Sequence, residues 1–175
     1  MNILNLKLLD IISECNKHIK RIIWAYEKIK LFLPKNKKEF EELSEDNITY
    51  IDQFLFRFSK LQDAMGEKLF KLILLTTGEN VKNKTFIDIL NRLEELNLIN
   101  KDKWLYLRNL RNSTNHEYSG EIEEIIIDLK DLLDNTKFLY NYFCNIKKFI
   151  FNNIVKYDEI DLNKYAIDTL EFPKE

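Results

Sequence analysis

The chain has 175 residues and a formal net charge of −2, with 45% hydrophobic and 32% charged residues. This length suits one domain with its own core, and the composition excludes an intrinsically disordered chain. The near-neutral charge gives no bulk signal for nucleic-acid binding, so any basic contact surface has to be local. Only three glycines and two prolines occur, which disfavours β-turns and favours long helices. We therefore expect an all-α fold, with residues 1–175 forming a single helical domain.

Apolar residues recur at three- and four-residue spacing in five segments, which is the pattern of helices that bury one face. The expected helices cover residues 3–33, 48–76, 85–96, 101–110 and 121–150. They predict an up-and-down bundle of four or five helices. The acidic, mixed segment 151–175 is expected to be a loosely docked tail.

The boundaries of these helices follow from breakers and caps. The first helix is expected to stop at Pro34, because the residue before a proline avoids the α region. The charged segment 35–46 is expected to be a loop, with Asp46 or Asn47 capping the next helix. Thr85 has the side chain of a good cap for the helix that follows it.

The segment 48–76 is apolar on more than one face, which is typical of a helix at the centre of a bundle. It also carries polar residues, for which two interpretations stay open. In the first interpretation, these residues form i,i+4 pairs on an exposed side of the helix. Alternatively, Arg57, Gln62 or Asp63 faces a functional cleft and orients a substrate.

The chain has few residues of the types that bind metals, and it lacks the apolar segments of membrane and secreted proteins, so several classes of function are excluded. Two histidines and the separated Cys15 and Cys144 supply no ligand spacing, so we expect neither a metal site nor a cofactor. No apolar run approaches the roughly 18 residues of a membrane-spanning helix, and the N-terminal segment lacks the features of a signal peptide. We therefore expect a cytoplasmic protein with free thiols and no membrane partner.

The stretch 104–120, WLYLRNLRNSTNHEYSG, holds the groups best suited to chemistry. Arg111 offers a planar fork of donors that can grip two phosphate oxygens. His116 titrates near neutrality and can move a proton in either direction. Together they suit cleavage of RNA by the 2′-hydroxyl of its own sugar, a reaction that needs no metal. The other histidine, His18, has no such neighbours in the sequence and is expected at the surface or the boundary of the core.

The spacing of the two groups makes a geometric demand. Arg111 and His116 are five residues apart, which places them about 140° apart on a straight helix. They can cooperate only if the helix loosens at 113–115, a run of weak helix formers. Asn112 lies four residues before His116 and can contact it directly. Because one histidine supplies either the acid or the base, we expect a homodimer that joins two such helix ends.

A basic run leads into this stretch. It consists of Lys101, Lys103, Arg108 and Arg111. The run is either a solvated helix face or a local basic patch that contacts RNA, and the sequence leaves both open. Besides Arg111, we take Arg108 as the member of the run that orients a substrate.

The segment RNSTNHEY, residues 111–118, resembles the Arg-x4-His-x-Tyr signature of the HepT-like toxins of the HEPN superfamily. The helical background and the position of the motif at the end of an internal helix fit this resemblance. Asn112 matches the polar residue that often follows the arginine in that superfamily. The Ser119-Gly120 pair departs from the usual continuation, so the exit of the loop is left open.

The resemblance implies a homodimeric, metal-independent endoribonuclease toxin of a type VII-like toxin–antitoxin system, with its cleft at the dimer interface. Arg111, Asn112 and His116 would be catalytic, and a nucleotidyltransferase antitoxin would adenylylate Tyr118. Such an adduct would place a bulky anionic group beside Arg111 and repel RNA. Two alternatives stay open. One is a non-catalytic helical partner that presents a nucleotide or substrate to a nucleotidyltransferase, and the other is a purely structural role for the motif.

Overall fold

The computed structural model describes residues 2–114, 121–155 and 171–173 of the chain. Within these ranges every regular element is a helix, which confirms the predicted all-α fold. In chain order the elements are α1 Ile3–Ile29, α2 Lys37–Glu41, α3 Glu45–Asp63, the π-helix η1 Ala64–Leu69, α4 Phe70–Thr76, α5 Phe86–Glu95, α6 Lys101–Thr114 and α7 Ile122–Asn153. No helix in these ranges is both long enough and apolar enough to cross a membrane.

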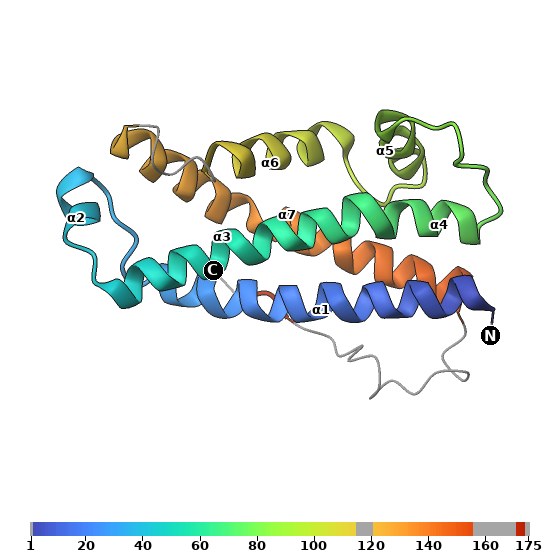
Figure 1. Ribbon diagram of the computed structural model, residues 1–175, viewed down its shortest axis with the longest axis horizontal. Coiled ribbons are helices and arrows are strands. Elements are labelled where there is room, and N and C mark those ends of the chain that lie inside the picture. The colour runs from blue at the N-terminus through green and yellow to red at the C-terminus, as the bar shows by residue number, and fades with distance from the viewer. Residues whose placement is uncertain (1, 115–120, 156–170, 174–175) are drawn as a thin grey trace.

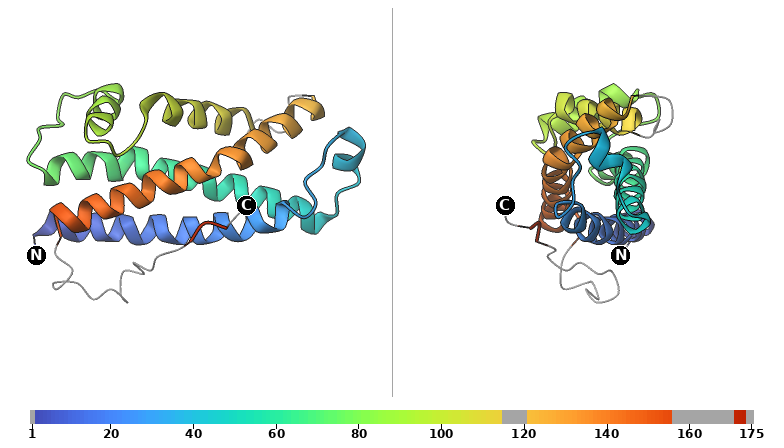
Figure 2. Two further views of the ribbon diagram at one scale, coloured as in Figure 1. Left: turned by 180° about the vertical axis from the view of Figure 1, so that it is seen from behind. Right: turned by 90° about the vertical axis from the view of Figure 1, so that its left-hand side faces the viewer.

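The long helices run alternately up and down an elongated bundle, as predicted (Figure 1). Helices α3, η1 and α4 join end to end into one continuous rod, and α1 packs along its length. Helix α6 lies on the side of the rod opposite α1, with the short α5 beyond one end of it. Helix α7 crosses the bundle obliquely and packs against both α6 and α1 (Figure 2).

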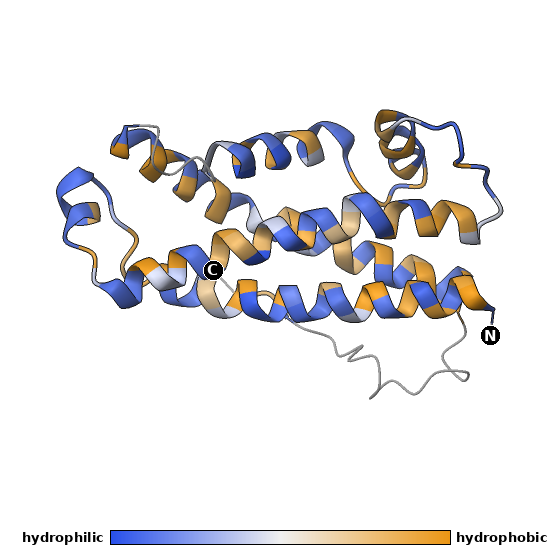
Figure 3. Cartoon of the chain, in the orientation of Figure 1, coloured by the Kyte–Doolittle hydropathy of each residue, from blue (hydrophilic) through white to orange (hydrophobic). Residues whose placement is uncertain are grey.

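Apolar side chains from all the long helices meet in one core between them. Helix α1 carries both apolar and polar positions along its whole length (Figure 3), and its buried residues recur at three- and four-residue spacing on one face. The largest fully buried side chains are Trp104, Phe54, Phe58, Phe70 and Phe143. The rings of Phe70 and Trp104 lie 4.6 Å apart between centroids and join α4 to α6. Each such burial contributes about 1.5–3 kcal/mol, so these aromatic contacts hold α6 firmly against the rod.

The beginning of the chain departs from the predicted boundaries. Helix α1 ends at Ile29 rather than at residue 33, because a turn over residues 30–32 precedes Pro34. The segment 35–46 contains the one-turn helix α2 and is therefore more than a loop. The Asn36 side chain caps α2 by accepting a 3.0 Å hydrogen bond from the Glu39 backbone.

The cap of α3 also differs from the prediction. Ser44, and neither Asp46 nor Asn47, is the N-cap residue, and its Oγ accepts a 3.2 Å hydrogen bond from the Asn47 backbone. The hydroxyl is one of the preferred caps, and here it stands three residues before the amide that it satisfies. Helix α3 consequently begins three residues before the predicted start at residue 48.

The described part of the C-terminal segment contacts the bundle through Phe172. Its ring lies 5.0 Å from the ring of Tyr26 on α1 and 5.4 Å from that of Tyr140 on α7, measured between centroids. Burial, together with a hydrogen bond involving Cys144, raises the pKa of Tyr140 to about 12. Residues 171–173 therefore cover a seam between the two longest helices.

Candidate functional site

Arg111, the arginine of the predicted site, reaches from the last turn of α6 to the end of α3. Its Nη1 donates a 2.6 Å hydrogen bond to Asp63 Oδ1 and approaches the Ser59 carbonyl oxygen at 3.4 Å. The Arg111 side chain is 13% exposed, whereas that of Asp63 is 43% exposed. Because the guanidinium is largely shielded from water, this pair is stronger than a fully exposed ion pair, which contributes about 0–1 kcal/mol.

Asn112 holds a second edge of the same guanidinium. Its Oδ1 accepts hydrogen bonds from Arg111 Nε at 3.2 Å and from Nη2 at 3.0 Å. Those two donors form one of the edges with which an arginine grips a phosphate. A phosphate that uses this edge has to displace a neutral amide, whereas the carboxylate of Asp63 holds the opposite end of the group. Asp63 thus fixes the guanidinium in place, and the Asn112 amide is the partner that a phosphate can replace.

The second half of the motif is described only in part. Helix α6 continues through Ser113 and Thr114, so the expected loosening is wrong for these two residues. Their hydroxyls donate to carbonyl oxygens of the preceding turn, at 2.8 Å and 2.9 Å respectively. Such back-bonding lets hydroxyl residues remain helical at the end of a helix. His116 and Tyr118 lie outside the described residues, and their approach to Arg111 stays a prediction.

A cavity of about 430 Å³ lies beside the Arg111–Asp63 pair, between the rod and the helices α5 and α6. It brings together three of the four residues predicted to orient a substrate, namely Gln62, Asp63 and Arg108. The fourth, Arg57, is not among its lining residues. The lining residues that sequence reasoning missed are Gly66, Glu67, Lys71, Lys84, Phe86 and Trp104.

Two buried side chains in the cavity wall have polar atoms without a hydrogen-bond partner among the described residues. Both amide atoms of Gln62 and the Nε1 of Trp104 are in this state, although the residues are only 3% and 1% exposed. Leaving a buried polar group unsatisfied costs about 1–3 kcal/mol. Folded proteins contain few such groups, so two of them on residues that line one cavity call for an explanation.

The π-helix η1 follows Asp63 directly and forms one wall of the cavity. Short π-helical turns inside α-helices occur frequently at functional sites, because they displace side chains from the regular helical pattern. Within η1, a Cβ atom at Gly66 would lie 3.4 Å from the Trp104 ring and 3.6 Å from the Phe86 ring. These are ordinary van der Waals distances, so both rings pack against η1 at this position. An isolated glycine within a helical pattern was the sequence signal for this wall.

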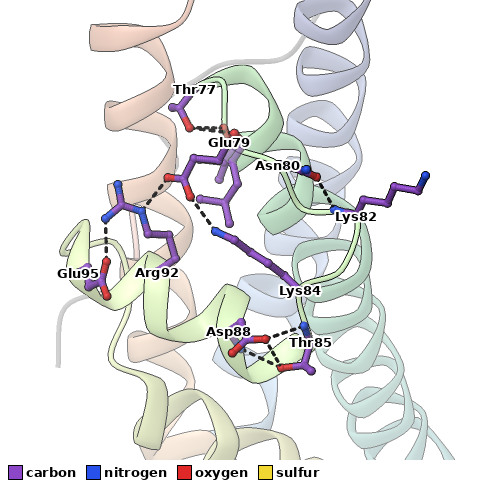
Figure 4. Close-up of polar contacts among 11 residues, drawn as sticks. Thr77, Glu79, Asn80, Lys82, Lys84, Thr85, Asp88, Arg92 and Glu95 are labelled. Carbon is purple, nitrogen blue, oxygen red and sulfur yellow. Dashed lines mark hydrogen bonds and ion pairs between the residues drawn. The ribbon is translucent and has the colours of Figure 1, made fainter.

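The connection between α4 and α5 contributes Lys84 to the lining of the cavity and is held by a set of polar contacts (Figure 4). Glu79 lies at its centre and accepts hydrogen bonds from Arg92 Nε at 2.7 Å and Lys84 Nζ at 2.9 Å. These bonds, led by the one from Arg92, hold the pKa of the Glu79 carboxyl below its ordinary value. Lys84 is thereby tied to the loop at the edge of the cavity.

Helix α5 begins with a capping box, which confirms the cap predicted at Thr85. The Thr85 side chain accepts a hydrogen bond from the Asp88 backbone, and the Asp88 side chain accepts one from the Thr85 backbone at 2.8 Å. Phe86 is the first residue after this cap, so the box fixes the backbone from which its ring lines the cavity. The guanidinium of Arg108 lies 5.3 Å from the centre of that ring.

Arg57 lies near the other histidine of the chain, where α3 faces α1. Its Nη1 is 3.5 Å from His18 Nδ1, so His18 has a polar neighbour that the sequence did not indicate. Partial burial and the positive charge of Arg57 lower the pKa of His18 from its ordinary value. This arrangement favours a neutral ring that accepts a hydrogen bond from the arginine.

Within the described ranges no group of three or more His, Cys, Asp or Glu side chains is arranged to hold a metal ion. Comparison with family models, with curated proteins and with solved structures yields no match. The fold and the site define an all-α bundle with an anchored arginine at the edge of a cavity lined by charged and aromatic side chains. Function is therefore inferred from these side chains and their chemistry.

Proposed function

We propose that the chain is a metal-independent endoribonuclease toxin of the HepT-like class in the HEPN superfamily, acting in the cytoplasm. The observation that carries the proposal is the anchored guanidinium of Arg111 beside a cavity, with Asp63 and Asn112 on two of its edges. Such a group suits a phosphate whose negative charge increases during reaction, because it is already oriented before RNA binds. The resemblance of residues 111–118 to the toxin motif supports the same conclusion.

In the proposed reaction the 2′-oxygen of a ribose attacks the adjacent phosphorus, and the bond from phosphorus to the 5′-oxygen of the next nucleotide breaks. A base removes the proton from the 2′-hydroxyl, and an acid delivers a proton to the departing 5′-oxygen. The products are a 2′,3′-cyclic phosphate and a free 5′-hydroxyl. Arg111 stabilises the five-coordinate phosphorus, and His116 transfers a proton.

A second histidine is required if one group acts as the base and another as the acid. Each chain carries one histidine in the motif, so we propose a homodimer in which two α6 ends face a shared cleft. Asn112, which now accepts from Arg111, would turn toward the RNA or toward His116 when a phosphate takes its place. Such an exchange costs little, because one neutral acceptor leaves as an anionic one arrives.

The proposed partner is a nucleotidyltransferase antitoxin that adenylylates Tyr118. Tyr118 is two residues from His116, so an adenylyl group there would add a phosphate and a bulky base next to the reacting groups. The phosphate would compete with RNA for Arg111. Intact mass of the chain after incubation with the antitoxin and ATP would show one added adenylyl group, and Tyr118→Phe should abolish the addition.

The central experiment measures cleavage of a single-stranded RNA by the purified chain in excess EDTA. We expect wild type to produce cyclic-phosphate ends and His116→Ala to be inactive with an unchanged melting temperature. His18→Gln is the matched control, because it removes the other histidine, and it should retain activity. If His116→Ala still cleaves RNA, or still arrests growth when expressed, the proposed function is wrong.

One observation favours the second candidate, a non-catalytic partner of a nucleotidyltransferase. The donors of Arg111 are already engaged by Asp63, Ser59 and Asn112, as in a group with a structural role. This candidate predicts a dimer that leaves RNA intact but binds a nucleotide at the cavity. A reading frame for a small nucleotidyltransferase next to the gene would agree with both candidates, so the cleavage assay decides between them.

A further inference from the structure

The cavity beside Arg111 has the chemistry of a site for a planar, hydrogen-bonding ring. The Gln62 side chain presents one donor group and one acceptor, and Trp104 Nε1 presents one donor. None of these atoms has a partner among the described residues, and both residues are at least nine-tenths buried. A side-chain amide is the group that pairs in two places with the edge of a nucleobase. A heteroaromatic ring would therefore satisfy the polar atoms that the fold leaves unpaired.

Aromatic side chains in the same wall complete such a site. The rings of Phe86 and Trp104 both lie close to Gly66 and line the cavity. Stacking on aromatic side chains is a general mode of binding for single-stranded nucleic acids, because every base has a π-face. The volume of about 430 Å³ falls within the range of small-ligand sites and is ample for one base.

The charges around the cavity favour a ligand with a phosphate. Lys71, Lys84, Arg108 and Arg111 all line it, against the carboxylates Asp63 and Glu67. Lys84 and Arg111 have carboxylate partners, Glu79 and Asp63. Lys71 and Arg108 have none among the described residues, and the carboxylate of Glu67 offsets only one of them, so one positive charge remains in excess. A base in the wall and a phosphate near Arg111 would match this distribution.

We propose that this cavity is a nucleotide subsite, in which Gln62 and Trp104 recognise a base while Lys71 and Arg111 hold its phosphate. The inference rests on the proposed function, since it makes the base next to the scissile phosphate a determinant of where RNA is cut. The same chemistry serves a nucleotide within an RNA strand and a free mononucleotide. Gln62 is then a specificity-determining residue rather than part of the cleavage chemistry.

Trp104 supplies a direct optical probe of this site. The chain has two tryptophans, and Trp24 lies on α1, 40% exposed, against Tyr50 and away from the cavity lining. In a Trp24→Phe, His116→Ala double variant, all indole emission comes from Trp104 and RNA is not consumed. We would titrate this full chain with each of the four nucleoside monophosphates and with short single-stranded RNA. Saturable quenching is expected, with a preference for one base.

Two substitutions in that background test the role of the cavity. Gln62→Leu keeps the volume but removes the unpaired amide, so affinity should fall roughly tenfold while the melting temperature rises by a few degrees. Lys71→Ala should weaken binding several-fold at low salt. Its matched control is Lys68→Ala, one turn earlier in the rod, because Lys68 pairs with Glu14 at 3.2 Å and does not line the cavity. That control should bind like the parent.

The outcomes separate the two proposals. Binding of RNA alone identifies a strand subsite, and binding of mononucleotides alone identifies a free-nucleotide site; both support the inference. An absence of saturable quenching, or equal affinity in the parent and in Gln62→Leu, overturns it. RNA cleavage by wild type without a cavity-dependent base preference would support the ribonuclease proposal and contradict the subsite proposal. Binding of nucleotides or RNA at the cavity, without any RNA cleavage by wild type, would support the subsite and contradict the ribonuclease proposal.

Discussion

Arg111 is held by protein groups on two of its edges before any ligand arrives. Asp63 anchors Nη1 at 2.6 Å, and the amide of Asn112 covers the edge formed by Nε and Nη2. A flexible arginine loses rotamer freedom when it binds a phosphate, whereas an anchored one has already lost it during folding. Asp63 therefore acts on the proposed chemistry through Arg111, as a positioning residue.

Asp63→Asn tests this positioning role. The substitution keeps an acceptor but removes the charge, so the guanidinium can move away from its alignment. We expect RNA cleavage to fall roughly tenfold to a hundredfold, mainly in kcat. Glu67→Gln is the control, because it removes a negative charge from the same cavity without touching Arg111 in the described contacts. Equal losses in the two variants would indicate a general electrostatic effect and contradict the positioning role.

His18 supplies a second prediction at the residue scale. Because burial and Arg57 lower its pKa, the unfolded chain takes up the proton before the folded chain as the pH falls below 6.5. Stability should therefore decrease from that pH down through the pKa of the folded state. We expect His18→Gln to lessen the drop in unfolding free energy between about pH 7.5 and about pH 5.5.

Urea denaturation at a series of pH values measures this effect. His116→Gln should be run in parallel, since His116 is the other histidine of the chain. The prediction for His18 concerns the unfolding free energy of wild type minus that of His18→Gln. This difference should become smaller as the pH falls. Parallel curves for the two proteins across the window would show that His18 titrates alike in the folded and unfolded chain.

At the scale of elements, the loop between α4 and α5 depends on one carboxylate. Glu79 joins Lys84, at the cavity edge, to Arg92 on α5. The side chain of Glu79 is 22% exposed, so solvent screens these ion pairs in part. The loop is nonetheless fixed at several points, since Thr85 and Asp88 form their capping box immediately after it.

We expect Glu79→Gln to lower the free energy of unfolding by about 1 kcal/mol at neutral pH. Because the pKa of Glu79 is lowered in the folded state, its contribution is complete above the ordinary value of 4.5. It disappears as the pH falls through the folded pKa, so wild type and variant should converge in acid. Chemical denaturation at neutral and acidic pH measures the difference. Glu95→Gln, on the exposed side of Arg92, is the control and should lose less.

The helices themselves were largely predictable, because each buries an apolar stripe whose spacing is visible in the sequence. Thr85 was equally visible as a cap, since its hydroxyl satisfies an amide three residues away. The cap of α3 was misplaced because Ser44 precedes two further residues with suitable side chains. Helix α2 was missed because a five-residue helix has no buried residue and hence no periodic signal.

In the candidate site, only the contacts between residues close in sequence were predictable. Arg111 and Asn112 are adjacent in the motif, so their association follows from the sequence. The ion pair with Asp63 joins residues 48 positions apart, and helical periodicity says nothing about such a pair. Similarly, the sequence suggested Gln62 as a substrate contact but could not show that its amide is buried without a partner among the described residues.

At the scale of the whole molecule, Phe172 links the far end of the chain to the bundle. Its ring lies between Tyr26 on α1 and Tyr140 on α7, so residues 171–173 contribute to the contact of two helices distant in sequence. Aromatic pairs of this kind contribute about 0.5–1.5 kcal/mol beyond the area that they bury. Residues 171–173 consequently contribute to the stability of the bundle.

Phe172→Ala should therefore lower the free energy of unfolding by about 1–2 kcal/mol, because it removes both ring contacts. Thermal and urea unfolding of the full chain measure the loss. Leu31→Ala is the control, since Leu31 is 82% exposed and its truncation should change stability by less than about 0.5 kcal/mol. If the two variants are equally stable, the segment does not hold the helices together.

The π-helix in the rod has a consequence for insertions and deletions. Each of its backbone hydrogen bonds spans one residue more than in an α-helix, so the rod contains an additional residue at this place. One residue corresponds to about 100° of rotation, which sets α4 in a different angular phase from α3. Deleting one residue from η1 would restore a uniform winding and turn the inward face of α4 away from α6. The ion pair at Asp63 before η1 and the tilted ring contact of Phe70 with Trp104 after it therefore form together only in a chain that is longer by a single residue at this place.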